Sequence, residues 1–315
     1  MKSFSPADRT VNLQKLQNQI FDLVIIGGGI NGAGIARDAT LRGMKVALIE
    51  ARDFASGTSS RSSKLIHGGI RYLENMEFHL VFEALSERKK LLDIAPHLVH
   101  PLRFFIPVYE GGRVGMGKMG LGMWAYDALA LFEAPESHDR WTTEEALEVV
   151  PSLQEKGLLG AYTYSDAYMD DDRLVLETLR SANEGDLTAA NYVSAIGCQL
   201  NDHKQLVAVK AKDNRSGEEI WIRGRNFVST VGPWTDELGS NLFGEWKQRL
   251  RPTKGVHLTF SRDRFPLPSA VVMALEERIV FAIPRHEMVI VGTTDTDYKG
   301  KPEDVRAETE DVDYL

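Results

Sequence analysis

The segment from Gly27 to Gly32 carries glycines at the spacing Gly-x-Gly-x-x-Gly, and an acidic residue, Glu50, follows about twenty residues after it. This spacing suits dinucleotide binding: Gly27 permits a tight turn, Gly29 lets a pyrophosphate approach the backbone, and Gly32 lets a helix and a strand pack closely. A carboxylate at Glu50 can bind both ribose hydroxyls and disfavours a 2′-phosphate, so NADP is the least expected dinucleotide. The alternative is a glycine-rich turn in an unrelated α/β protein.

Two further segments bear on which dinucleotide is bound. A serine-rich run, Ser56 to Ser63, leads directly into apolar residues, the Gly68-Gly69 pair and aromatic residues. This order favours a loop of N–H groups and hydroxyls laid against a polar heterocycle, the alternative being a flexible linker. A late apolar strand, Phe227 to Val231, ends at Gly232-Pro233, where a second nucleotide contact could form. Together these segments favour a tightly held flavin over a nicotinamide.

The elements that must position these residues are indicated early in the chain. The apolar run from Phe21 to Ile26 is typical of a buried parallel strand, and a helical stretch from Asn31 to Leu41 follows, ending at Gly43. Lys45 to Glu50 predicts a second buried strand. These segments predict a β-α-β unit with a right-handed crossover.

Later segments predict more helices and a mixed sheet. An amphipathic helix is expected over 78–95, stopped by Pro96, and another over 173–183, started by the acidic run 170–172. The predicted strands are 192–196, 206–212 and 219–222 in a small sheet with a turn at 214–217, a separate strand at 227–231, and a hairpin of 279–283 with 288–291. The fold class is therefore α/β, a nucleotide-binding domain interleaved with a mixed-sheet domain.

The last residues carry a helix-start pattern. Thr309 is the candidate N-cap, acidic residues follow in the first turn, and Val312 and Leu315 are the first apolar face positions. The sequence stops where this helix begins, so we expect these 315 residues to be part of a longer protein.

Composition argues against several classes of protein. Lys and Arg number 37 against 45 Asp and Glu, and the net charge of −8 argues against a nucleic-acid binder. The 43% of hydrophobic residues and 26% of charged residues are typical of a folded chain, and the length predicts two domains or one elaborated domain. The single cysteine, Cys198, excludes an intrachain disulfide and a Cys-x-x-Cys pair, so we expect a reducing compartment.

Two segments bear on whether the chain is exported or contacts a membrane. Met1 to Asn18 lacks the apolar run and cleavage site of a secretory signal. The most apolar long stretch, Met119 to Phe132, is interrupted by Asp127 and is too short to cross a bilayer. It could lie in a membrane interface, because Trp124 and Tyr126 suit the headgroup boundary, but a buried helix of a second domain is the favoured interpretation.

No metal site is predicted. The acidic run 170–172 precedes a helix, where acids favour the positive helix end. His97 and His100 lie one turn apart without an evident third ligand. The sequence has no Gly-x-Ser-x-Gly motif and no Gly-x-x-x-x-Gly-Lys-[Ser/Thr] motif, which weakens hydrolase and kinase interpretations.

The glycine turn and the serine-rich segment together resemble one family. Residues 26–43 read Ile-Gly-Gly-Gly-Ile-Asn-Gly-Ala-Gly-Ile-Ala-Arg-Asp-Ala-Thr-Leu-Arg-Gly, and residues 58–73 read Thr-Ser-Ser-Arg-Ser-Ser-Lys-Leu-Ile-His-Gly-Gly-Ile-Arg-Tyr-Leu. Both are similar to segments of the FAD-dependent glycerol-3-phosphate dehydrogenases. The resemblance covers essentially the whole chain from Phe21 and continues in short motifs at 95–98, 164–166, 171–174, 232–234, 254–257, 278–281 and 292–295.

The resemblance implies a Rossmann-type FAD-binding domain of the glutathione-reductase type, interleaved with a mixed-sheet α+β substrate-covering domain. The expected parts are an N-terminal extension (1–20), the FAD-binding domain (21–75 plus 155–240) and the substrate-covering domain (76–154 plus 241–315). The family extends beyond a point equivalent to residue 315 and there adds a flavin-binding segment and arginines for the substrate phosphate. Whether residues 1–315 alone retain FAD or activity is therefore left open.

The resemblance also implies an activity. The family oxidises sn-glycerol 3-phosphate to dihydroxyacetone phosphate by hydride transfer from C2 to N5 of FAD, and passes the electrons to membrane quinone. The residues expected to contact FAD are Gly27, Gly29, Ile30, Asn31, Gly32, Glu50, Ala51, Arg52, Thr58, Ser59, Ser60, Ser63, Lys64, Leu65, His67, Gly68, Gly69, Val193, Gly232 and Trp234.

The implied reaction assigns roles to residues around the Gly68-Gly69 pair. His257, with a reference pKa of about 6.5, is the preferred general base or hydroxyl-orienting group, the alternative being a structural strand histidine. Arg71, followed by Tyr72, is expected to stabilise a developing alkoxide or hold phosphate, the alternative being a surface ion pair. Lys254 is expected to face the substrate phosphate or the pyrimidine edge of the flavin, the alternative being a solvated lysine.

The implied partners are sn-glycerol 3-phosphate, membrane quinone and a membrane surface, with no nucleic acid and with a homodimer left open. The expected location is the cytoplasm, peripheral on the inner face of the cell membrane. Three alternatives use other chemistry: a glycerophosphate oxidase that passes electrons to oxygen, a flavin-binding module without turnover, and an NAD-dependent dehydrogenase.

Overall fold

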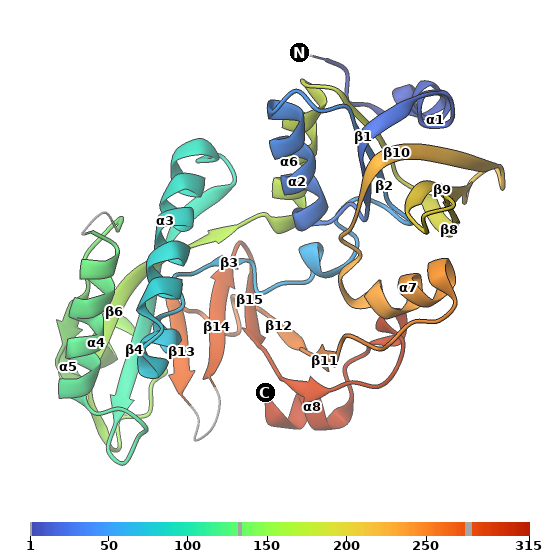
Figure 1. Ribbon diagram of the computed structural model, residues 1–315. Helices are drawn as coiled ribbons and strands as arrows, with labels where there is room; N and C mark the ends of the chain where they lie inside the picture. The colour runs from blue at the N-terminus through green and yellow to red at the C-terminus, as the bar shows by residue number, and fades with distance from the viewer. Residues whose placement is uncertain (1, 132–133, 275–278) are drawn as a thin grey trace. The chain divides into compact units, whose positions relative to one another are not determined.

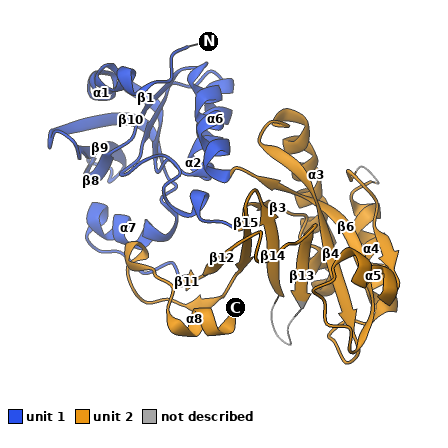
Figure 2. Cartoon of the chain, turned by 180° about the vertical axis from the view of Figure 1, so that it is seen from behind, with its two compact units in different colours: residues 1–62, 171–252 blue, residues 63–170, 253–315 orange. Residues whose placement is uncertain are grey.

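The computed structural model describes residues 2–131, 134–274 and 279–315. The chain forms two compact units (Figure 2): unit 1 comprises Met1–Ser62 and Asp171–Pro252, and unit 2 comprises Ser63–Asp170 and Thr253–Leu315. The chain therefore passes three times from one unit to the other. Arg278, in one of the motifs that carry the resemblance, and Phe132, the last residue of the apolar stretch, lie outside the described residues.

Unit 1 is built on a six-stranded sheet (Figure 1). In spatial order its strands are β7 (Leu187–Ala190), β2 (Val46–Ile49), β1 (Ile20–Ile26), β10 (Glu219–Ser229), β9 (Leu206–Asp213) and β8 (Val193–Leu200). The strands β7, β2, β1 and β10 are parallel, whereas β10, β9 and β8 pair antiparallel. The predicted β-α-β unit is confirmed, because α2 connects β1 to β2.

Helices cover both faces of this sheet. They are α1 (Arg9–Asn18), α2 (Ile30–Leu41), α6 (Asp171–Asn183) and α7 (Thr235–Phe243), with the 3₁₀ helices η1 (Pro6–Asp8), η2 (Thr58–Ser60) and η4 (Gly232–Trp234). Figure 1 shows α2 and α6 side by side, and Ala33 and Ala36 of α2 are buried with Ile25 of β1 in the core on that face. Leu16 of α1 and Leu238 of α7 pack into the core on the other face. The small alanines let α2 lie close to the sheet, so its N-terminus follows directly on the end of β1.

Two predictions for unit 1 are corrected. The segments 219–222 and 227–231, predicted as separate strands, are parts of the single strand β10, which pairs first with β9 and then with β1. The residues expected as an N-terminal extension, 1–20, instead pack within unit 1. Leu16 is fully buried there, and the Arg9 guanidinium forms an ion pair with Asp213, with 2.7 Å between Nη2 and Oδ1.

Unit 2 is built on an eight-stranded mixed sheet. Its strands run in the order β12 (His257–Ser261), β15 (Met288–Gly292), β14 (Ile279–Arg285), β13 (Ala270–Ala274), β4 (Val99–Tyr109), β6 (Leu158–Met169) and β3 (Leu65–Ile66), with β5 (Asp139–Trp141) also paired to β6. A separate pair is formed by β11 (Thr253–Lys254) and β16 (Thr296–Asp297). The predicted hairpin of β14 and β15 is confirmed.

The helices of unit 2 pack on both faces of its sheet. They are α3 (Phe78–Ile94), α4 (Met116–Leu129), α5 (Thr143–Val149) and α8 (Thr309–Tyr314), with η3 (Ile70–Asn75) and η5 (Pro302–Asp304). Leu85 of α3 and Met123 of α4 are buried on one face with Phe104 of β4, whereas α5 packs on the other face. The apolar stretch that begins at Met119 is therefore part of a helix of the second unit, as favoured, but it is buried on one side only: Met123 and Tyr126 are buried, whereas Leu121 and Trp124 are exposed. Among the described residues, no helix combines the length and hydrophobicity needed to cross a membrane.

The domain boundaries lie elsewhere than the sequence suggested. The expected boundaries followed residues 75, 154 and 240, whereas the units change after residues 62, 170 and 252. The reason is strand pairing: β6 pairs with β4 over its full length and β3 pairs with β6, so both segments belong to unit 2. At the last helix, the N-cap is Glu308 instead of Thr309, and it forms a capping box with Asp311.

Candidate active site

The glycine turn after β1 is held by close backbone contacts. Gly27 has a φ of +113°, and a Cβ there would lie 2.7 Å from the Thr230 carbonyl oxygen. A Cβ on Gly32 would overlap the Gly27 carbonyl oxygen. The Thr230 hydroxyl donates to that same carbonyl at 2.9 Å. Neither glycine can carry a side chain without moving the turn, as the spacing predicted.

The turn is more open at Gly29, which is the N-cap of α2 and has extended backbone. A Cβ on Gly29 would meet only the Ser59 hydroxyl, at 3.1 Å. That hydroxyl accepts a hydrogen bond of 3.0 Å from the Ile30 amide, and Asn31 follows in the exposed first turn of α2. Amides at a helix N-terminus attract anions, so this end of α2 fits a pyrophosphate.

Glu50 lies directly after β2 and beside the glycine turn. Its Oε2 accepts a hydrogen bond of 2.7 Å from the Gly28 amide, and its Oε1 accepts one of 2.8 Å from the Arg52 amide. The Val193 amide donates to the Glu50 carbonyl at 2.8 Å, which ties β8 to the same point. An ionised carboxylate has about four acceptor positions, so two remain for ribose hydroxyls.

A tryptophan lies over the entry to the serine-rich segment. The Arg52 guanidinium lies 5.0 Å from the centre of the Trp234 ring, and a Cβ on Gly57 would lie 3.1 Å from that ring. Thr58 and Ser60 form η2 with Ser59. Other predicted cofactor residues lie nearby: the Ala51 carbonyl accepts from Asn214, and Gly232, with a φ of +55°, begins η4. Unit 1 thus brings together the glycine turn, Glu50, the η2 hydroxyls and Trp234.

In unit 2, Ser63 and His257 form a hydrogen-bonded pair, with 2.8 Å between Oγ and Nε2. His257 is the first residue of β12, and Ser63 lies two residues before β3. Burial, and secondly the nearby charge of Lys64, lower the pKa of the His257 imidazole. The imidazole is therefore neutral at pH 7, the state that a general base requires. Leu65 continues the same segment into the unit 2 sheet.

The Gly68-Gly69 turn rests on buried side chains that the sequence analysis did not single out as a site. The Gly68 amide donates to Asp166 Oδ1 at 3.1 Å, and that carboxylate forms an ion pair with Arg88. The Tyr126 hydroxyl also donates to Asp166, at 2.8 Å to Oδ1. Burial raises the pKa of Asp166, and the Arg88 charge opposes this effect. Asp166 appeared only within a family motif, and nothing in the sequence separates Arg88 from the polar residues of an amphipathic helix.

Arg71 and Tyr72 lie in η3, immediately after this turn, and both are exposed. His67, just before the turn, is exposed as well. The Arg71 guanidinium makes no ion pair or hydrogen bond with any residue that the structure describes, so the alternative of a surface ion pair is not observed. Its planar set of donors is available to an oxyanion.

Lys254 has a different environment from the one expected. It is 6% exposed, and its ammonium lies 2.7 Å from Asp311 Oδ2 and 3.1 Å from Glu308 Oε2. The hydrogen bond that the Lys254 ammonium donates to Asp311, opposed by burial, raises the pKa of Lys254. Lys254 therefore ties β11 to the capping box of α8, and its role toward substrate or flavin stays a prediction.

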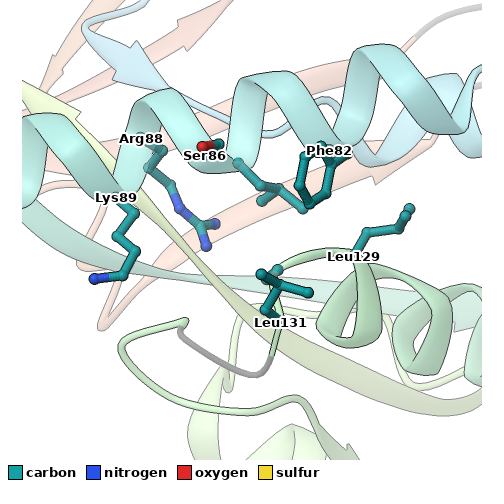
Figure 3. A pocket seen from close by; sticks show the side chains of 8 residues that line it. Phe82, Ser86, Arg88, Lys89, Leu129 and Leu131 are labelled. Carbon is teal, nitrogen blue, oxygen red and sulfur yellow. The ribbon is translucent and has the colours of Figure 1, made fainter.

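A hollow on unit 2 shares Arg88 with the support of the Gly68-Gly69 turn. Figure 3 shows Phe82, Ser86, Arg88 and Lys89 of α3 around it, with Leu129 and Leu131 from the end of α4. None of the predicted site residues lines it. Within the described ranges, no group of three His, Cys, Asp or Glu side chains is arranged to hold a metal ion.

Comparison with known proteins identifies the family. The model of the family described as "FAD dependent oxidoreductase" matches residues 22–315. The chain belongs to the FAD-dependent oxidoreductases. The match confirms the predicted flavin cofactor and α/β fold, and it disfavours the nicotinamide alternative. The residues after β1, after β2 and in η2 fit FAD, because they pair an open helix N-terminus with a fixed carboxylate.

Several members of this oxidoreductase family are similar over almost the whole chain. The alpha-glycerophosphate oxidase of Streptococcus pyogenes serotype M6 is 41% identical over 99% of the chain and 52% of its own length. The aerobic glycerol-3-phosphate dehydrogenase of Staphylococcus saprophyticus is 39% identical over 99% of the chain and 57% of its own length. The structure of the Bacillus halodurans glycerol-3-phosphate dehydrogenase complexed with FAD superimposes with a TM-score of 0.81 at 32% identity, covering 99% of this chain and 55% of that chain. The chain thus spans about half the length of the curated relatives it matches.

Proposed function

We propose that this protein oxidises sn-glycerol 3-phosphate to dihydroxyacetone phosphate with FAD as its redox cofactor. The observation that carries the proposal is the similarity, at 39–41% identity over 99% of the chain, to relatives named for this substrate. The arrangement of residues within each unit supports it, because an alcohol oxidation needs a nucleotide site, a base and a group that binds the phosphate.

When bound, the flavin would supply the acceptor for the hydride of the alcohol carbon, which carries both electrons of the oxidation. Unit 1 holds the cofactor. The N-terminus of α2 binds the pyrophosphate, and the carboxylate of Glu50 accepts hydrogen bonds from the ribose hydroxyls. Ser59 keeps the first amide of α2 directed to the same place. Trp234 and Arg52 restrict the entry to η2.

His257 takes the proton from the C2 hydroxyl of the substrate. Its imidazole is neutral at pH 7 because burial and Lys64 lower its pKa, so a ring nitrogen lone pair is available. Ser63 contacts Nε2 and fixes the rotation of the ring. Which nitrogen carries the proton follows from whether the Ser63 hydroxyl donates or accepts.

Arg71 binds the phosphate or the developing alkoxide of the substrate. Its guanidinium is exposed and lacks an acidic partner among the described residues. Tyr72, its neighbour in η3, is 38% exposed and supplies a phenol on the same short helix. Lys254 is kept as a substrate-binding prediction that requires the ammonium to leave Asp311.

The test is an anaerobic visible spectrum of the protein with FAD, before and after addition of sn-glycerol 3-phosphate. We expect the flavin band at about 450 nm to be present and to bleach with this substrate, as in a flavin half-reaction. Glycerol, which lacks the phosphate, is the matched control and should leave the band unchanged. A flavin band that persists with glycerol 3-phosphate contradicts the proposal and favours a flavin-binding module without turnover.

Membrane quinone is the electron acceptor that we propose, and oxygen is the alternative, because the similar proteins include dehydrogenases and oxidases. A soluble quinone analogue should be reduced during turnover in the absence of oxygen. In air without quinone, turnover should form little hydrogen peroxide. Peroxide in amounts equal to the substrate consumed would assign the protein to the oxidases.

The quinone proposal includes contact with the inner face of the cell membrane through α4. Leu121 and Trp124, one turn apart on α4, are 74% and 62% exposed, and Lys118 lies one turn before them. Exposed aromatic and basic side chains on one helix face suit an anionic lipid surface. The protein should therefore sediment with vesicles that contain anionic phospholipid. Leu121→Ser with Trp124→Ser should reduce this binding, whereas Leu41→Ser, at an equally exposed leucine of unit 1, should not.

A further inference from the structure

Three side chains from separate elements of unit 2 meet beneath the Gly68 amide. Asp166 of β6 accepts a hydrogen bond of 3.1 Å from that amide. Its carboxylate also forms an ion pair with Arg88 of α3. The hydroxyl of Tyr126 of α4 lies 2.8 and 3.0 Å from its two oxygens and donates to the carboxylate. Arg88 also donates to the Ser165 carbonyl at 2.8 Å. Two side chains, Arg88 and Tyr126, therefore fix the carboxylate, and its third contact is the Gly68 backbone.

These groups are almost completely removed from water. Asp166 is 0% exposed, and Arg88 and Tyr126 are 1% exposed. A buried ion pair gives little net stability compared with apolar residues of similar volume, because both charges lose their hydration. Stability alone therefore does not account for the arrangement. What the charge does provide is a strong acceptor at a fixed position for one backbone N–H.

The backbone at Gly68 also lies directly on this cluster. A Cβ on Gly68 would overlap the Leu85 side chain and the Tyr126 hydroxyl. The next residue, Gly69, has a φ of +70° and is the N-cap of η3. The position of η3, and with it the starting point of the Arg71 side chain, thus follows from where Gly68 is held.

We propose that Asp166, oriented by Arg88 and Tyr126, is a positioning residue: it holds the Gly68-Gly69 turn so that Arg71 and His67 keep one geometry toward flavin and substrate. This inference rests on the proposed function for the roles of Arg71 and His67. The hydrogen bond to Gly68 itself is independent of that function. Asp166 acts through the backbone and does not contact the reacting atoms.

Two buried tyrosines provide a matched pair of variants. The rings of Tyr126 and Tyr164 lie 5.5 Å apart, and both side chains are buried. Of these two tyrosines, Tyr126 is the one whose hydroxyl donates to Asp166. Tyr126→Phe removes one support of the carboxylate and keeps the ring and the Arg88 ion pair, whereas Tyr164→Phe removes a hydroxyl nearby without touching that support.

The first readout is amide hydrogen exchange of the segment 66–72 in the protein loaded with FAD. We expect exchange about tenfold faster in Tyr126→Phe than in the unchanged protein, since a weakened acceptor lets the turn open more often. Tyr164→Phe should leave this segment unchanged. Equal exchange in both variants would overturn the inference.

The second readout is the rate constant of flavin reduction by sn-glycerol 3-phosphate. Tyr126→Phe should lower it about tenfold with FAD retained, and Tyr164→Phe should lower it less than twofold, because only the first variant loosens the turn. A rate unchanged in Tyr126→Phe, with exchange of 66–72 accelerated, would also overturn the positioning role. If the unchanged protein is not reduced by this substrate, the proposed function fails, and hydrogen exchange still decides whether Asp166 holds the turn.

Replacing only one residue of the Arg88–Asp166 pair could unfold the protein, so a double variant is also tested. Arg88→Met with Asp166→Asn removes both charges at once and keeps similar side-chain volumes. It should fold, bind FAD and show the same faster exchange over 66–72. If the segment stays protected when both charges are absent, packing or a neutral amide acceptor is enough to hold the turn, and the role given to the Asp166 carboxylate is overturned.

Discussion

The turn after β1 in unit 1 and the turn before η3 in unit 2 both depend on glycine, but different atoms hold them. Gly27 and Gly32 pack against backbone atoms and the Thr230 hydroxyl, and the Gly28 amide between them donates to the half-buried Glu50 carboxylate. Gly68 instead lies on a buried ion pair and a tyrosine hydroxyl. Both turns thus commit one amide to a carboxylate, but Glu50 is half-buried and keeps acceptor positions open to a ligand, whereas Asp166 is fully buried and enclosed by Arg88 and Tyr126.

The difference teaches how each turn serves its expected ligand. A pyrophosphate carries its own charge, so the amides and the dipole at the N-terminus of α2 attract it, while the half-buried Glu50 carboxylate beside the turn is left for ribose hydroxyls. A turn that presents Arg71 needs a fixed position more than it needs free amides. An internal carboxylate supplies that position, at the cost of burying two charges.

The largest effect is expected when the Arg88–Asp166 ion pair beneath the Gly68-Gly69 turn is broken. Arg88→Met leaves the fully buried Asp166 carboxylate without its ion-pair partner. Loss of one partner of a buried pair costs about 3–5 kcal/mol in the free energy of unfolding. Urea unfolding measures this loss. Arg88→Met with Asp166→Asn should recover most of it, and a loss below about 1 kcal/mol in the single variant would mean that the pair is solvated.

The corresponding change in unit 1 is Gly32→Ala, whose methyl group would overlap the Gly27 carbonyl oxygen. Overpacking of this kind costs about 1–3 kcal/mol. Because the strain lies at the pyrophosphate site, the Kd for FAD should rise about 10- to 100-fold in a fluorescence titration.

Gly34→Ala is the control for that change, because Gly34 lies on the same helix with no atom near its Cβ position. It should raise stability by about 0.5–1 kcal/mol, since alanine is the better helix former, and leave FAD affinity unchanged. Equal effects of the two substitutions on affinity would contradict the packing argument for Gly32.

The ion pair between Arg9 and Asp213 lies in unit 1 away from the glycine turn, so it tests whether charge pairs of that unit affect FAD binding. Burial alone would raise the pKa of Asp213, but hydrogen bonds from Arg9, the Arg215 amide and Ser216 lower it to about 2. A carboxyl with a folded pKa below its unfolded value stabilises above the unfolded value, near pH 4, and loses that contribution as the pH falls toward 2. The contribution at neutral pH is about 2 kcal/mol.

Arg9→Gln removes one of these donors and keeps the Arg215 amide and Ser216, so it should lower stability at pH 7 by about 1 kcal/mol and make its dependence on pH between about 4 and 2 shallower. Thermal unfolding over this pH range measures both. FAD affinity should not change. A loss of FAD affinity as large as that of Gly32→Ala would show that this ion pair and the glycine turn are coupled.

The smallest expected effect concerns His257. The rate of flavin reduction should fall as the pH drops through the lowered pKa of its imidazole, because the protonated ring cannot accept a proton. Lys64→Gln removes the neighbouring charge that helps to lower this pKa, so the falling limb should move to higher pH. His257→Gln should abolish the limb. An identical pH profile in Lys64→Gln would leave burial as the single cause.

The comparison of turns also explains what the sequence could predict. The glycine turn, α2 and both of its flanking strands are encoded within residues 20–50, so spacing and apolar runs were sufficient. The support of Gly68 comes from Arg88, Tyr126 and Asp166, which are distant in sequence and ordinary in type. Nothing local indicates that they meet.

Strand pairing between distant segments limits what the sequence predicts about strand and domain boundaries. Polar residues interrupt the apolar pattern between 219–222 and 227–231, so the sequence predicts two separate strands. In the structure, pairing first with β9 and then with β1 keeps β10 continuous. The domain boundaries differ from the predicted ones for a related reason: β6 pairs with β4 and β3 of the segment 63–170, and β4 pairs with β13 of the segment 253–315. Tertiary pairing overrides local pattern in both cases.

The dependence of the glycine turn on Thr230 has a consequence for the order in which the molecule can be made. During synthesis, β1, α2 and β2 leave the ribosome first, but β10 and the Thr230 hydroxyl follow only after the intervening residues of unit 2. Until then the edge of β1 is unpaired, and the Gly27 carbonyl lacks its donor. A nascent chain that ends before Thr230 therefore has the complete glycine motif in its sequence but not the turn that the motif describes.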